Sequence, residues 1–193
     1  MLIILAFIRV MAVKKTSERS SIIRGFLLAG KVITEETDLA RELFNQGRFG
    51  IVLESKKVQL SIIEALYLLE KEKIVVCQKK KKIKFDELIK TGEKKEPEIW
   101  TRFLVYKDLR NRGYVVKTAL KFGADFRVYD RGVKPGEDHA KWIVYPVTES
   151  SAITWYEFAA KNRVAHSTKK RLLIAIVDDE CDVTYYEIKW TRP

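Results

Sequence analysis

Cysteine, histidine and proline are scarce in this chain of 193 residues, which has two cysteines, two histidines and four prolines. Cys77 and Cys181 are far apart and form no CxxC pattern, which argues against a disulfide framework and against a zinc cluster, and so favours a reducing cytoplasm.

The apolar opening at residues 1–13 is interrupted by Arg9. It is too short to span a bilayer and lacks the basic start of a signal peptide. We expect a first strand there, or upstream sequence if Met11 is the true start.

Charged residues are abundant, and the basic ones outnumber the acidic ones. Lysine and arginine number 37 against 26 aspartates and glutamates, which gives a net charge of +11 and a pI near 9.6. The excess favours a polyanionic partner without identifying it. The hydrophobic content of 47% is ample for a buried core, and the length allows one large or two small domains.

The first part of the chain, residues 1–92, is expected to be a small N-terminal α/β domain. Its apolar patterns predict strands at 22–28, 31–34, 50–53 and 74–77, and helices within 37–47 and 60–74. Ser61 and Glu64 form a capping box at the start of the second helix. The segment TGEKKEP at 91–97 is predicted to be the linker between the two parts of the chain. The lysine run at 79–82 is typical of a solvated face, with phosphate contact as the alternative.

The second part, residues 98–193, is expected to be a mixed α/β domain of the restriction-endonuclease-like type. A helix over 98–113 can end at Gly113 in a left-handed conformation. The patterns that follow predict three strands, a helix and a hairpin, at 114–120, 125–130, 141–147, 154–167, 171–178 and 183–190. The whole chain is therefore predicted to belong to the mixed α/β class.

Three residues in this second part suit cleavage of RNA through its own 2′-hydroxyl. Tyr129 can act as a base, His139 as an acid and Lys170 as a fixed cation, so the chemistry requires no metal and no cofactor. Each has an ordinary alternative: a strand-end tyrosine is often core, a loop histidine is often merely exposed, and a lysine at a helix end is favoured by the dipole. The second histidine, His166, lies on a predicted helix and is expected to be structural.

The order of these motifs resembles the archaeal tRNA-splicing endonucleases. The resemblance is carried by residues 106–132 with their FGADF strand and following tyrosine, by His139, and by residues 163–188 with an S-x-K-K-x-L turn into a strand. GRFG at 47–50 and LSIIEALYLLE at 60–70 are similar to the family's N-terminal domain. One departure is Cys181, which stands where the family usually has glycine.

The resemblance implies metal-independent excision of introns from precursor tRNA at bulge-helix-bulge junctions, leaving a 2′,3′-cyclic phosphate and a 5′-hydroxyl. Tyr129 would take the proton from the 2′-hydroxyl, His139 would give one to the leaving oxygen, and Lys170 would stabilise the transition state. In the family two residues clamp a flipped bulge base between them. Arg163 matches the first of these by position, and Trp190 is the nearest candidate for the second, with ordinary packing under the C-terminus as the alternative.

The resemblance also implies assembly. The acidic loop at Asp178, Asp179, Glu180 and Asp182 matches a family loop that docks into a basic groove of another subunit. The partner is a second copy in a homo-oligomer, or a homologous non-catalytic subunit in a heterotetramer, and the sequence leaves both open.

Two other functions stay open at this point. A metal-dependent nuclease of the restriction type would need a clustered acid pair followed by E-x-K on adjacent strands, which is not evident in the sequence. A non-catalytic RNA-binding or assembly subunit would keep the fold and lose the triad, whereas this chain has all three residues.

Overall fold

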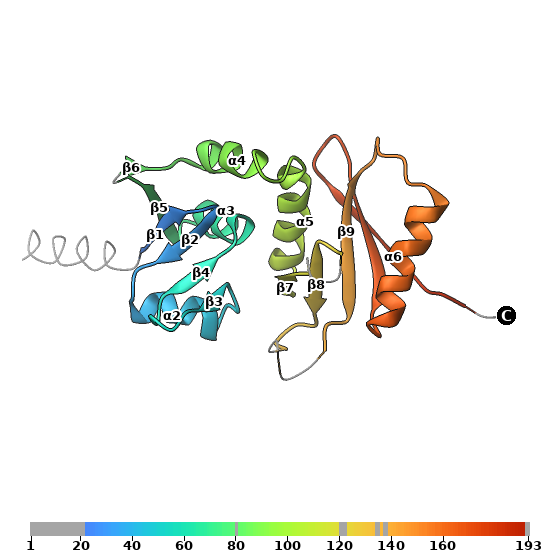
Figure 1. Ribbon diagram of the computed structural model, residues 1–193, viewed down its shortest axis with the longest axis horizontal. Helices are drawn as coiled ribbons and strands as arrows, with labels where there is room; N and C mark the ends of the chain where they lie inside the picture. Colours follow the sequence, from blue (N-terminus) through green and yellow to red (C-terminus); the bar gives the residue numbers. More distant parts are fainter. Residues whose placement is uncertain (1–21, 80, 120–122, 134–135, 137–138, 192–193) are drawn as a thin grey trace, which may run out of the picture. The chain divides into compact units, whose positions relative to one another are not determined.

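The computed structural model describes residues 22–79, 81–119, 123–133, 136 and 139–191. The chain divides into two compact units, one up to Lys94 and one from Lys95 (Figure 1). The predicted first strand in the apolar opening, and the question of Met11 as the start, lie outside the described residues.

The N-terminal unit contains a six-stranded mixed sheet in the order β3-β4-β2-β1-β5-β6. Only β1 and β5 run parallel, and the other neighbours are antiparallel. Its strands are β1 (Ile23–Leu28), β2 (Lys31–Thr34), β3 (Ile51–Val52), β4 (Val58–Leu60), β5 (Ile74–Gln78) and β6 (Lys81–Lys82), and its helices are α2 (Asp38–Asn45), α3 (Ile62–Glu70) and α4 (Phe85–Glu93). The mixed α/β class predicted from the sequence is confirmed for this part of the chain.

Helix α3 begins where its capping box predicts. The Ser61 hydroxyl accepts from the Glu64 N–H, and the Glu64 carboxylate accepts from the Ser61 N–H at 2.9 Å. Glu64 is also buried and accepts from the Gly50 N–H at 2.8 Å, so the same carboxylate ties the segment before β3 to the helix. Gly50 has a φ of +61°, and a Cβ there would lie 2.4 Å from the Gln59 carbonyl oxygen, so glycine is required.

The linker prediction for residues 91–97 is wrong in its first half, because α4 continues to Glu93 and only a short turn separates it from the next helix. The helix was missed because its N-cap is Lys84, which has no side-chain acceptor, within a run of charged residues. Glu87 instead accepts from the Lys84 N–H at 2.9 Å. The short strands β4 and β6 were also not predicted.

The C-terminal unit contains a five-stranded sheet in the order β11-β10-β9-β8-β7. Only β9 and β10 are parallel, and they are joined by α6. The elements are α5 (Ile99–Asn111), β7 (Val115–Thr118), β8 (Phe126–Tyr129), β9 (Trp142–Thr148), α6 (Trp155–Ser167), β10 (Arg171–Val177) and β11 (Val183–Ile188). Each overlaps a predicted element, and Gly113 ends α5 with a φ of +89°.

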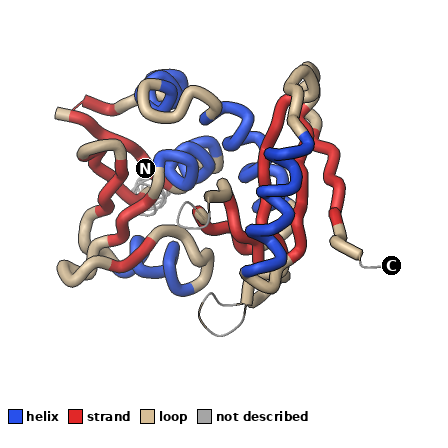
Figure 2. Tube along the Cα trace, turned by 45° about the vertical axis from the view of Figure 1, so that its right-hand side comes forward, coloured by secondary structure: helices blue, strands red, loops and turns tan. Residues whose placement is uncertain are grey.

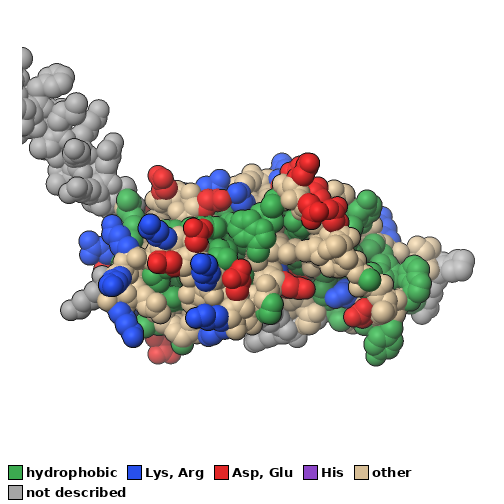
Figure 3. Space-filling model, turned by 90° about the horizontal axis from the view of Figure 1, so that it is seen from above, with side chains coloured by type: hydrophobic (Ala, Val, Ile, Leu, Met, Phe, Trp, Pro, Cys, Tyr) green, Lys and Arg blue, Asp and Glu red, His purple; other side chains and the backbone are tan. Residues whose placement is uncertain are grey.

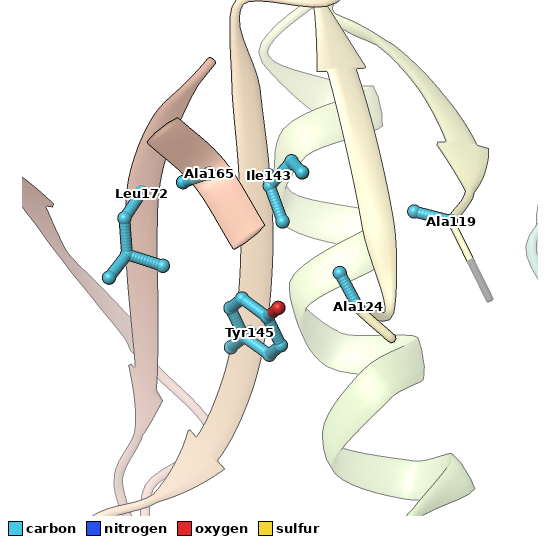
Figure 4. Packing of buried hydrophobic residues seen from close by; sticks show 6 residues of the cluster. All are labelled: Ala119, Ala124, Ile143, Tyr145, Ala165 and Leu172. Carbon is cyan, nitrogen blue, oxygen red and sulfur yellow. The ribbon is translucent and has the colours of Figure 1, made fainter. Parts of the chain in front are cut away.

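Helices pack on both faces of this sheet. Phe126 on β8 packs its ring 5.8 Å from that of Tyr106 on α5. Ile143 and Leu172, which are register partners, lie on the other face and pack around Ala165 of α6 (Figures 2 and 4). Successive side chains of a strand point to opposite faces of the sheet, so the core has two halves, one covered by α5 and the other by α6.

Candidate active site

The strand register of the C-terminal sheet brings the three predicted catalytic segments to one edge. Val128 pairs with Trp142, and Trp142 pairs with Arg171. The end of β8 and the beginnings of β9 and β10 therefore lie side by side. Tyr129 is the last residue of β8, and Lys170 directly precedes β10. Because adjacent strands are about 4.8 Å apart, the backbones of these two residues are separated by roughly 10 Å.

Tyr129 is fixed by packing. Its ring packs with Val115, its register partner on β7, and with Ala140, and only 4% of the residue is exposed. Arg127, two residues earlier on the same face, places its guanidinium carbon 6.0 Å from the ring centre. A side chain held this firmly presents its phenol in one orientation.

His139 lies in the connection between β8 and β9, three residues before Trp142, and its side chain is exposed. The next residue, Ala140, packs on Tyr129. This contact keeps the backbone of His139 beside the tyrosine, although His139 comes ten positions later in the sequence. The structure therefore brings His139 to the same sheet edge as Tyr129.

Lys170 is positioned by the end of α6. Lys169 adopts a left-handed conformation with φ +55°, and the Lys170 N–H donates to the Ala165 carbonyl at 2.9 Å, which is a Schellman-type ending. The Lys170 Nζ donates to the Thr168 carbonyl oxygen at 2.7 Å. The ammonium thus lies at the negative end of the helix dipole, half-buried and directed by the turn.

The two predicted base-clamping residues are both exposed, but they lie on different elements. Arg163 is on α6, and Trp190 follows β11 with 51% of its surface exposed. Trp190 contacts His166, one turn beyond Arg163, with ring centres 4.6 Å apart and planes at 88°. His166 therefore orients the indole on the helix face that carries Arg163.

The acidic loop is a tight turn between β10 and β11. The Asp178 carboxylate accepts from the Asp182 N–H at 2.8 Å, and the Asp179 N–H donates to Glu149 at 3.2 Å. Glu180 is exposed at the tip. Figure 3 shows acidic side chains gathered at this end of the C-terminal unit. Their concentration in a turn held by its own hydrogen bonds makes a rigid, negatively charged projection.

Cys181 in this turn has a φ of +69°, a conformation that costs a non-glycine residue about 1–2 kcal/mol. Glycine relieves that strain but loses more chain entropy on folding, so Cys181→Gly should raise the free energy of unfolding by about 0.5–1 kcal/mol. Thermal unfolding measures the difference. Cys181→Ser is the control, because it removes the thiol and keeps the Cβ. An equal gain in the serine variant would contradict the backbone explanation.

The same edge holds further side chains that the sequence motifs do not single out. The Trp142 indole donates to Glu187 at 2.7 Å, and the Arg171 guanidinium is 3.0 Å from the other oxygen of that carboxylate. Tyr114 meets Trp142 edge to face at 5.5 Å. One sequence signal could have found the cations here: a lysine or arginine follows each of the three proposed catalytic residues within two positions.

In the part of the chain that the structure describes, no helix is both long and apolar enough to cross a membrane. Within the same part of the chain, no three histidine, cysteine, aspartate or glutamate side chains come together as a metal-binding group.

The fold defines a two-unit mixed α/β protein whose five-stranded C-terminal sheet carries the three predicted catalytic residues near the ends of its strands. The family model for the tRNA intron endonuclease catalytic C-terminal domain matches residues 99–185, and that for the N-terminal domain matches residues 23–89. The chain belongs to the tRNA intron endonuclease family, a family of enzymes.

Its relatives support this membership over most of the chain. It is 42% identical to a tRNA-splicing endonuclease of Thermococcus onnurineus, across 86% of this chain and 96% of that protein. The tRNA-splicing endonuclease of Methanothermobacter thermautotrophicus is 41% identical, with the same coverage. That of Nanoarchaeum equitans is 45% identical over 70% of this chain and 90% of its own length.

Proposed function

We propose that this protein excises introns from precursor tRNA by cutting at bulge-helix-bulge junctions, without a metal ion. The proposed products are a 2′,3′-cyclic phosphate and a 5′-hydroxyl. The observation that carries the proposal is the shared sheet edge of Tyr129, His139 and Lys170 in a member of this enzyme family. These side chains supply the base, the acid and the cation that this transesterification needs.

The proposed reaction assigns one bond change to each residue. Tyr129 removes the proton of the 2′-hydroxyl, whose oxygen then attacks the adjacent phosphorus. The bond from phosphorus to the 5′-oxygen breaks, and that oxygen takes a proton from His139. Lys170 stabilises the negative charge that builds on the phosphoryl oxygens. Since Tyr129 is only 4% exposed, the mechanism requires that the phenolic end be the part that RNA reaches.

The clamping role of Arg163 and Trp190 belongs to the same proposal. A guanidinium and an indole can hold an unpaired base between them by stacking and cation–π attraction. The contact of Trp190 with His166 supports the role, because it places the half-exposed indole on the α6 face that carries Arg163. His166 itself would then serve structure rather than proton transfer.

We also propose that the protein acts as an oligomer through the acidic loop. Two bulges flank each intron, so two active sites must face one RNA. The rigid turn of Asp178, Asp179, Glu180 and Asp182 is negative in a chain of net charge +11, which favours a basic surface of another subunit as its partner. A second copy and a homologous non-catalytic subunit both fit this chemistry.

Chelation separates this proposal from a metal-dependent nuclease. Cleavage of a bulge-helix-bulge RNA should proceed at an unchanged rate in excess EDTA, because the three proposed groups supply the chemistry that a metal ion would otherwise provide. The test is a single-turnover time course with and without chelator. Complete loss of activity, restored by added magnesium, would replace the proposed mechanism with the metal-dependent one.

A non-catalytic RNA-binding subunit is the other alternative. Purified protein that binds the RNA and leaves it intact, but assembles with a separate cutting subunit, would favour that function. The presence of all three proposed catalytic side chains at one edge favours the enzyme.

A further inference from the structure

The catalytic edge carries a second group of side chains beside the three proposed catalytic residues. We call Arg131, Lys141 and Arg171 the basic rim. The Arg131 guanidinium carbon lies 5.3 Å from the centre of the Tyr114 ring, and the Lys141 Nζ lies 4.3 Å from that of Trp142. Tyr114 and Trp142 contact each other edge to face, so Arg131 and Lys141 rest on two rings that touch.

Each rim residue comes shortly after one of the proposed catalytic residues in the sequence and lies near the same strand ends. Arg131 comes two residues after Tyr129, Lys141 two after His139, and Arg171 directly after Lys170. The Arg171 N–H donates to the Lys141 carbonyl at 3.0 Å, and the Lys141 N–H donates to that of Val128 at 2.8 Å. These hydrogen bonds place Lys141 and Arg171 along the strand ends that carry the proposed catalytic residues, and Arg131 follows the end of β8 two residues after Tyr129.

Two carboxylates form ion pairs with Lys141 and Arg171 but leave both of these side chains partly exposed. Asp130 lies 3.2 Å from the Lys141 Nζ, and Glu187 lies 3.0 Å from Arg171. Hydrogen bonding from the Trp142 indole, with the nearby Arg171 charge, lowers the pKa of Glu187, so this carboxylate is ionised at neutral pH. The Arg171 and Lys141 side chains are still 51% and 36% exposed. Surface ion pairs of this kind are weak, so the cations can exchange a carboxylate for a stronger anion.

The two aromatic rings hold two of the three rim cations. Lys141 lies over the Trp142 ring and Arg131 over the Tyr114 ring, while the two rings also contact each other. Cation–π contacts restrict where the charged groups of Arg131 and Lys141 point. The arrangement suits a row of anionic groups spaced along a strand.

We propose that the basic rim binds the ribose–phosphate backbone of the RNA on either side of the bond that is cut. The inference rests on the proposed function, because it takes that RNA as the ligand. The rim fixes the register of the backbone at the edge, so that one phosphate meets Tyr129, His139 and Lys170. Its chemistry recognises phosphate and carries no base preference.

The test is the salt dependence of RNA binding. The probe is a bulge-helix-bulge RNA with 2′-deoxy residues at the cleavage sites, and fluorescence anisotropy gives Kd between about 50 and 200 mM salt. Removing one cation that binds a phosphate should lower the slope of log Kd against log salt by about 0.7–0.9. Arg131→Ala, Lys141→Ala and Arg171→Ala should each show this decrease.

Two further variants make the outcome decisive. Arg171→Lys keeps the charge and should keep the slope, which separates phosphate contact from a folding defect. Arg41→Ala is the matched control: Arg41 is also paired with a carboxylate and is 38% exposed, but it lies on α2 in the other unit. Its slope should be unchanged. An unchanged slope in all three rim variants would overturn the inference while leaving the proposed cleavage intact. A lowered slope in rim variants of a protein that cuts no RNA would support the rim and defeat the proposed function.

Discussion

Replacing Tyr129 by phenylalanine should slow the cleavage step by about 10²- to 10⁴-fold with little change in RNA affinity, since positioned proton transfer contributes that much. Phenylalanine preserves the packing of the ring against Val115 and Ala140, so the folded unit should be retained. His139→Ala should give a decrease of the same size. Its side chain is exposed, so removing it should barely change the free energy of unfolding. Lys170→Ala should be as slow, because it removes the charge that stabilises the transition state.

The measurement is single-turnover cleavage of a bulge-helix-bulge RNA at saturating enzyme. His166→Ala is the matched control, because it removes the other histidine, which is also exposed and lies on the neighbouring helix. That variant should cleave within a few fold of wild type. Near-wild-type rates for Tyr129→Phe or His139→Ala would rule out the proposed roles even though the family membership stands.

Neutralising the acidic loop should dissociate the enzyme. The triple change of Asp178, Asp179 and Asp182 to asparagine removes three charges and retains the acceptor that holds the Asp182 N–H. Charged pairs that are buried on association are worth about 2–5 kcal/mol, so Kd for the subunits should rise by roughly 30- to 4,000-fold. Native mass spectrometry should then show a shift toward the protomer mass of 22.5 kDa.

A charge-matched control separates the loop from net charge. Glu54, Glu70 and Glu72 are exposed residues of the N-terminal unit, and changing all three to glutamine removes the same charge. That variant should keep its native mass. Circular dichroism should show both variants folded, since surface charges contribute little to stability. An unchanged native mass in the loop variant would exclude the docking role.

Local chemistry makes much of the fold predictable from sequence. The capping box of Ser61 and Glu64, the left-handed Gly113 and the hairpin around Asp178–Asp182 are each formed by residues a few positions apart. Their hydrogen bonds and backbone preferences depend on neighbours in the chain, so the sequence pattern is sufficient to predict them. Helix α4 shows the limit, because its N-cap Lys84 has no side-chain acceptor and its start has no local signature.

The candidate site was predicted from sequence only as three residues in a familiar order, and their proximity depends on the packing of the C-terminal sheet. Tyr129 and Lys170 are brought to one edge by the pairing of β8, β9 and β10, which forms because the Ile143 and Leu172 side chains are buried together under α6. Such pairing depends on contacts between residues far apart in sequence, which no local pattern specifies. The burial of Tyr129 and the grouping of the basic rim arise in the same way. The amino-acid order specifies which side chains are present and which helices and turns they form locally, whereas the packed sheet specifies which of them meet.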